Sequence, residues 1–149
     1  MTPSSSFQSA TWHDPHFKEM RIELFTLCEG AVDQGGRLSL AGTYEVIQCP
    51  CFPTTVPKLT IAMRLRFWPG EAHHHSVRLC LVSPDGKWFG GAFEGTITLT
   101  PPDLERSSAH HFILDVLGVP FERAGEYAVD FYLDDHFESR IPLFVEAVG

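Results

Sequence analysis

The closing segment of the chain, residues 125–148, constrains the fold more strongly than any other stretch. From Tyr127 to Leu133 apolar and more polar residues alternate, so that one side of the segment is apolar throughout. After a polar turn, Ile141, Leu143 and Val145 continue the same period on the same side. Alternation with period two is typical of a β-strand with one buried face. We therefore predict an antiparallel hairpin, whose apolar face requires a second layer of structure to cover it.

The same period recurs along most of the chain. Turn signals at Gly35-Gly36, Pro69-Gly70 and residues 83–86 separate the apolar series, because Gly and Pro at such positions favour tight turns. A proline-rich stretch, residues 49–57, is expected to connect two sheets. The remaining predicted strands are residues 21–28, 37–47, 59–68, 77–82, 88–99 and 112–117. This pattern predicts an all-β fold: a two-layer antiparallel β-sandwich of about eight strands, immunoglobulin-like or jelly-roll-like.

The length of 149 residues indicates one domain that is large enough to bury a core without disulfides or metals. We expect residues 20–149 to form this domain, because the first strand pattern starts next to Met20. Residues 1–19 are polar, carry the Ser4-Ser5-Ser6 tract and show no period, so we interpret them as an N-terminal appendage.

Charge and hydropathy exclude several function classes. The formal net charge is −8 and no basic stripe is present, which argues against nucleic acid as a partner. No apolar run approaches the roughly 18 residues that a transmembrane helix needs. The first residues also lack the positive and apolar regions of a secretory signal. We therefore expect a cytoplasmic protein without a membrane partner.

Three short segments carry a resemblance to known proteins. They are the hairpin entry at residues 35–42, the turn at residues 83–86, and residues 117–127, which lead into the final hairpin. With these segments, residues 20–148 resemble a family of small bacterial β-sandwich proteins of uncharacterised function. The resemblance implies the fold and contributes no catalytic residues, since turn patterns of this kind occur in many sandwiches.

Histidines provide the most conspicuous chemical pattern. In an extended chain His73 and His75 project to the same side and offer two ligands for a divalent metal, which is the only cofactor we consider. A His-x-His pair of this kind is similar to the metal site of cupins, although no Glu follows it at the cupin spacing. His110 or His111 would supply a further ligand from across the sandwich. The simpler interpretation is a polar loop.

Cysteines offer a weaker signal. Cys49 and Cys51 are separated by one residue, whereas zinc sites generally use two pairs with the spacing Cys-x-x-Cys. A disulfide across a single residue would be strained. We interpret these cysteines as thiols without a site function.

Candidate binding residues lie at turns and strand ends. Asp134, Asp135 and His136 gather polar groups at the tip of the final hairpin, where solvated turn chemistry is the simpler interpretation. Trp68 and Trp88 flank turns and offer rings for a sugar or a protein partner. Tyr127 has the position of the corner tyrosine of sandwich domains, whose hydroxyl bonds to nearby backbone.

These observations favour a binding or interaction module over an enzyme, with a protein or a small ligand as its partner. Pro142 marks the last strand as an edge or a bulged strand, and an edge strand would also allow a homodimer. Two alternatives remain: a cupin-like metal-binding protein or metalloenzyme built on the histidines, and a carbohydrate-binding module built on the tryptophans.

Overall fold

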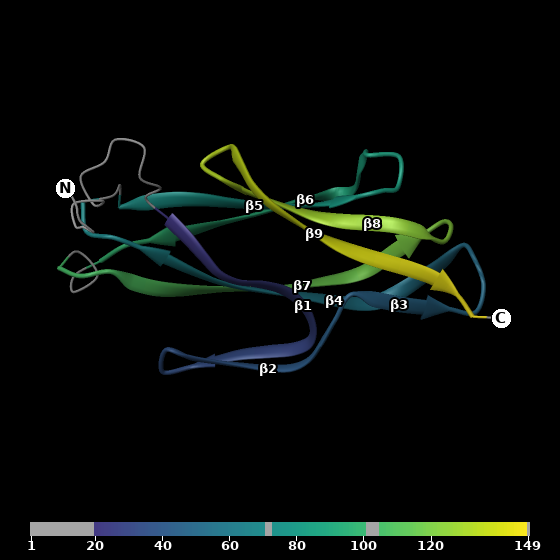
Figure 1. Cartoon of the computed structure of the whole chain (residues 1–149), viewed down its shortest axis with the longest axis horizontal. Coiled ribbons are helices and arrows are strands. Elements are labelled where there is room, and N and C mark those ends of the chain that lie inside the picture. The colour runs from purple at the N-terminus through teal and green to yellow at the C-terminus, as the bar shows by residue number, and fades with distance from the viewer. Residues whose placement is uncertain (1–19, 71–72, 101–104, 149) are drawn as a thin grey trace, which may run out of the picture.

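The computed structural model describes residues 20–70, 73–100 and 105–148, and these residues form nine β-strands (Figure 1). Residues 1–19, the predicted appendage, lie outside the described part of the chain. The strands are β1 (Met20–Gln34), β2 (Arg37–Tyr44), β3 (Val46–Cys49), β4 (Thr54–Phe67), β5 (His74–Val82), β6 (Trp88–Thr98), β7 (Ser108–Phe121), β8 (Gly125–Leu133) and β9 (His136–Ala147).

The strands form two sheets, which confirms the predicted all-β class. The four-stranded sheet is antiparallel with the order β2-β1-β4-β7, and the five-stranded sheet has the order β3-β9-β8-β5-β6. The five-stranded sheet is mixed, because β3 runs parallel to β9, and it curls strongly into a half-barrel. The prediction of a purely antiparallel sandwich of about eight strands was wrong on this point. The predicted strand 37–47 divides at Glu45, so that β2 stays with β1 while β3 crosses to the other sheet.

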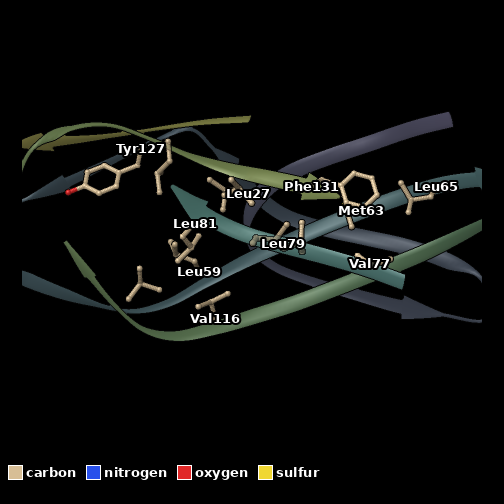
Figure 2. Packing of buried hydrophobic residues seen from close by; sticks show 14 of the residues in the cluster. Leu27, Leu59, Met63, Leu65, Val77, Leu79, Leu81, Val116, Tyr127 and Phe131 are labelled. Carbon is tan, nitrogen blue, oxygen red and sulfur yellow. The ribbon is translucent and has the colours of Figure 1, made fainter. Parts of the chain in front are cut away.

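The apolar faces of both sheets meet in one core (Figure 2). The closing hairpin contributes as predicted: Tyr127, Val129, Phe131 and Leu133 are buried. Facing them, the inward series of β4 is 0–1% exposed: Leu59, Ile61, Met63, Leu65 and Phe67. Tyr127 also donates a hydrogen bond from its hydroxyl to the Arg123 carbonyl at 2.8 Å, so the predicted corner tyrosine is confirmed.

The β1–β2 ribbon folds back over the outer side of the four-stranded sheet. β1 pairs with β4 only as far as Cys28 and then continues with β2 alone. The end of this ribbon returns to β7, where Asp33 Oδ2 lies 3.0 Å from Nδ1 of His111. Consistent with this cover, Thr60 and Ala62 of β4 are buried although they alternate with the core residues. β4 is therefore buried on both faces, which alternation alone did not predict.

Pro142 lies in the half of β9 that is an edge. On the side away from β8, β3 pairs only with Phe144–Ala147, and within the described chain no strand pairs there with residues 136–143. The Phe144 amide donates outward to the Glu45 carbonyl at 2.7 Å. Pro142 lies two residues before Phe144, so its backbone nitrogen points to the same side of β9. Because proline has no N–H, this free edge lacks a hydrogen-bond donor at Pro142. The prediction of an edge is confirmed for this half of the strand.

The described residues contain no helix that is long and apolar enough to cross a membrane.

Candidate functional site

The candidate site is the outer face of the five-stranded sheet, which is built by β9, β8, β5 and β6. On β5 the residues alternate, with Val77, Leu79 and Leu81 in the core and Arg78 and Cys80 on the outer face. The register places these outer residues beside those of the neighbouring strands. Three transverse rows result: Pro142, Ala128, Val82 and Trp88; then Arg140, Asp130, Cys80 and Ala92; then Phe137, Tyr132, Arg78 and Glu94.

The centre of this outer face is buried, although it faces away from the core. Cys80 is 0% exposed and Asp130 is 3% exposed. Arg140 reaches over from β9 and donates two hydrogen bonds to the Asp130 carboxylate, from Nε at 2.6 Å and from Nη2 at 3.0 Å. Burial raises the pKa of the Cys80 thiol, so this thiol stays protonated and unreactive at neutral pH. The long Arg140 side chain therefore lies along the middle row and covers Asp130.

Aromatic rings gather around one arginine at the side of this face. The Arg78 guanidinium carbon lies 4.9 Å from the ring centre of Tyr132 and 5.7 Å from that of Trp88. The Trp88 and Tyr132 rings meet edge to face with centroids 5.8 Å apart, and Phe137 packs on Tyr132 in the same manner at 5.6 Å. Trp88 is 50% exposed and Phe137 is 54% exposed. We call Arg78, Trp88, Tyr132 and Phe137 the aromatic cluster.

The β8–β9 turn holds the cluster in place. Asp134 and Asp135 both have left-handed backbone conformations, with φ of 50° and 67°. Asp135 Oδ1 accepts a hydrogen bond from Arg78 Nη1 at 3.0 Å. Asp134 accepts from the Ser76 amide at 2.9 Å and contacts His75 Nδ1 at 2.7 Å. Both carboxylates therefore tie the turn to β5.

The pKa of Asp134 reports these contacts. Partial burial works to raise it, but the hydrogen bonds from the Ser76 amide and from His75, together with the charge of His75, outweigh burial. The net pKa of Asp134 is below its ordinary value, so its carboxylate is ionised at neutral pH.

The histidines predicted to bind metal lie in different surroundings. His75 is buried, with its ring stacked on Phe67 at 4.7 Å, whereas His73 and His74 are exposed. His110 packs edge to face on the same Phe67 ring at 5.8 Å. In residues 20–70, 73–100 and 105–148 no three His, Cys, Asp or Glu side chains come together in a way that would hold a metal ion. Metal binding by His73 and His75 stays a prediction.

His111 contacts two side chains of the four-stranded sheet, whereas Cys49 and Cys51 form no disulfide. The His111 ring lies between Arg64, whose Nη1 is 3.0 Å from Nε2, and Asp33 on its other side. Cys49 is buried and Cys51 is exposed, and both are free thiols.

Among the predicted binding residues, Trp88 and Asp135 both contact Arg78, whereas Asp134 contacts His75 and Ser76. His136, the first residue of β9, is exposed next to Asp135. Trp68 lies elsewhere, half-buried, with the Arg21 guanidinium 5.5 Å from its ring centre.

Asp85 lies at the opposite end of β5 from the β8–β9 turn, because Val82 pairs with Ala128 at the start of β8. Asp85 there pairs with Arg123 at 2.8 Å. Residue-by-residue reading missed Arg78, Tyr132 and Phe137. Alternation along the closing hairpin already places Tyr132 on the outer face. Only the pairing of neighbouring strands shows that Arg78 and Phe137 lie beside it.

A groove continues the face beyond the cluster. It has a volume of about 480 Å³ and lies between the β5–β6 turn and the edge half of β9. Its apolar walls are Pro84, Pro142, Val82 and Ala128, and its charged rim is formed by Glu126 and Arg140.

Fold and site together define a class: a two-sheet β domain that presents aromatic side chains and a groove on one outer face. The profile of a family of unknown function, DUF6941, matches residues 23–146, and the chain belongs to this family. The resemblance to an uncharacterised family is thus confirmed, while its bacterial character stays a prediction.

Two further comparisons, with curated proteins and with solved structures, give no information beyond the fold. A search among curated proteins finds none that matches. A solved structure of the alkylpurine DNA glycosylase AlkC from Pseudomonas fluorescens, bound to DNA containing an abasic site analog, matches with a TM-score of 0.50 and 11% identity. The match covers 87% of this chain and 31% of that chain, so this chain corresponds to less than a third of the glycosylase.

Proposed function

We propose that the domain is a non-catalytic interaction module that binds a polypeptide partner on the outer face of the five-stranded sheet. The observation that carries this proposal is the aromatic cluster, in which Trp88 and Phe137 are half exposed around a fixed arginine. Trp, Tyr and Arg are the residues most enriched at the energetic centres of protein interfaces. Large apolar side chains that remain exposed side by side are a common mark of such a site.

The cluster is also held rigid before a partner arrives. Arg78 is fixed by Asp135 on one side and by the rings of Trp88 and Tyr132 on the others. A side chain that is ordered already loses little conformational entropy on binding, and this entropy is a major cost of association. The geometry therefore favours binding over a purely structural role for these side chains.

The free edge of β9 is poorly suited to bind a partner strand. Pro142 offers no backbone donor at that edge, and the register between β8 and β9 shifts at Phe131 and Tyr132. Proline and bulges at sheet edges oppose the addition of a further strand. A partner on this side is therefore expected to contact side chains of the face.

A polypeptide suits the rings better than a sugar does. Trp88 and Tyr132 meet at 68°, and Tyr132 and Phe137 meet at 74°. Rings at such angles do not form a shared flat platform, whereas they form pockets for protruding side chains. DNA, present in the AlkC structure, is not proposed for this chain, because its net charge of −8 disfavours phosphate.

The burial of two histidines that contact carboxylates supports a module without catalysis. His75 and His111 each contact a carboxylate through Nδ1, an arrangement that general bases use. However, their side chains are only 5% and 4% exposed, so neither ring is accessible to a substrate in solution.

We further propose that the topology is immunoglobulin-like. The neighbouring strands β9, β8 and β5 follow the order G-F-C of that fold, and β4 next to β7 follows the order B-E. The corner tyrosine at Tyr127, near the start of the strand equivalent to F, supports the same assignment.

Site-specific crosslinking tests the proposed function. A photoreactive phenylalanine analogue at position 137, in cells that produce the protein natively, is expected to yield a discrete protein adduct. Adding Trp88→Ala should abolish this adduct, and because Trp88 is half exposed and packs only on Arg78 and Tyr132 among the contacts described above, the melting temperature should fall by no more than a few degrees and the domain should stay folded. The same analogue at Leu117, which is 74% exposed on β7, is the matched control and should give no such adduct. An adduct that survives Trp88→Ala, or that forms equally from position 117, would overturn the proposal.

A further inference from the structure

The charges of the outer face indicate what kind of polypeptide it binds. Both arginines of the face already have anionic partners: Arg78 pairs with Asp135 at 3.0 Å, and Arg140 pairs with the buried Asp130. Neither guanidinium therefore presents a net positive charge to a partner. A carboxylate brought by the partner would have to displace one of these internal pairs.

The acidic side chains at the rim are in the opposite situation. Glu94 lies on β6 beside Arg78 in the register, and Glu126 lies at the groove. Both residues are exposed, and in the described part of the chain neither carboxylate has a hydrogen bond or an ion pair. Asp135 is 79% exposed and binds Arg78 through one oxygen only. The face is thus bordered by carboxylates that can accept further donors.

The aromatic cluster and the global charge favour the same partner. The exposed rings of Trp88 and Phe137 attract cations through their π faces. The chain as a whole carries −8, which steers basic molecules toward it and repels acidic ones. Between the carboxylates, the groove walls of Pro84 and Pro142 accept an apolar side chain.

We infer that the partner is a basic polypeptide segment, which places an apolar side chain in the groove and Lys or Arg groups against Glu94 and Glu126. This inference rests on the proposed function, since it specifies the ligand of the same face. A second copy of this chain does not meet the requirement, because its net charge of −8 would repel the first.

A displayed library of random peptides, selected on the full-length protein and depleted on the Trp88→Ala variant, tests the inference. Peptides that require Trp88 are expected to carry a net positive charge, and their binding should weaken as salt is raised. Glu94→Gln with Glu126→Gln should weaken this binding by about threefold to thirtyfold, as two partly exposed ion pairs imply. Glu29→Gln with Glu45→Gln removes the same charge from exposed positions outside the face and is the matched control.

The possible failures are distinguishable. Neutral or acidic peptides that require Trp88, and that bind equally well to the Glu94→Gln, Glu126→Gln variant, would overturn the inference and leave the proposed function standing. Equal weakening in the control variant would show a general charge effect and would also overturn the inference. A selection that yields only peptides indifferent to Trp88→Ala would contradict the proposed function itself.

Discussion

The pair of Asp130 and Arg140 allows a quantitative test of how the outer face is held together. The Asp130 side chain is only 4% exposed, whereas the Arg140 side chain is 53% exposed. The hydrogen bond and the charge of Asp130 raise the pKa of Arg140. Because one partner is buried and the other is half in water, removal of each partner should have a different cost.

Arg140→Met removes the charge but keeps an apolar stem that can still cover Asp130. It leaves a buried carboxylate without its cation, and breaking a buried pair in this way costs about 3–5 kcal/mol. Water reaches the half-exposed side of this pair, so we expect a loss of about 2–3 kcal/mol in the free energy of unfolding. Asp130→Asn leaves the arginine in water and keeps one acceptor oxygen, so its cost should be about 1 kcal/mol.

Urea denaturation followed by tryptophan fluorescence measures both values. For a domain of this size, the melting temperature of Arg140→Met should fall by about 4–12 °C. The double variant Asp130→Val with Arg140→Met is the control, and it should regain most of the stability because no unpaired charge remains. Equal costs for Arg140→Met and Asp130→Asn, or a double variant as unstable as Arg140→Met, would refute this account of the pair.

Three further predictions concern the rest of the fold. Hydrogen bonds from Arg66 and Arg64 of β4 lower the pKa of Glu23 below its ordinary value of 4.5. The stability that the ionised Glu23 contributes is therefore present above pH 4.5 and is lost as the pH falls. In acid titrations, the difference in unfolding free energy between wild type and Glu23→Gln should shrink. Tyr127→Phe removes the hydrogen bond to the Arg123 carbonyl and should lower the unfolding free energy by about 1 kcal/mol. A Cβ at position 95 would lie 2.6 Å from the Phe112 ring, so Gly95→Ala should cost about 1–3 kcal/mol in thermal melts, and Phe112→Leu in the same chain should recover part of it.

Much of the fold follows from local sequence patterns. The inward series of the closing hairpin and the turn at Gly35-Gly36 were predictable, because both depend on residues close together in the chain. The break at Glu45 was not, since β2 and β3 read as one alternating strand and separate only because they pair with different sheets. The buried Thr60 and Ala62 escaped prediction for a related reason. The β1–β2 ribbon, which is distant in the sequence, covers these two residues. The alternation within β4 gives no indication that this ribbon folds back over the sheet.

The candidate site was only partly predictable, because its members come from four strands. Trp88, Asp134 and Asp135 could be selected singly as exposed or polar turn residues. The meeting of Trp88 and Asp135 at Arg78 depends on the register of β5 with β6 and β8, which is set by the packing of the opposite, apolar face. The buried side thus determines which side chains of the exposed side become neighbours.

The β8–β9 turn shows why the sequence departs from simple turn rules here. A two-residue hairpin turn with both residues left-handed favours Asn-Gly, because only glycine adopts this conformation without steric cost. The chain instead has Asp134 and Asp135 at φ of 50° and 67°. Glycine at either position would relieve the backbone but would remove the carboxylate that binds His75 or Arg78. Because left-handed strain persists where the surrounding structure requires it, the turn supports the interpretation that Arg78 is held in position for binding.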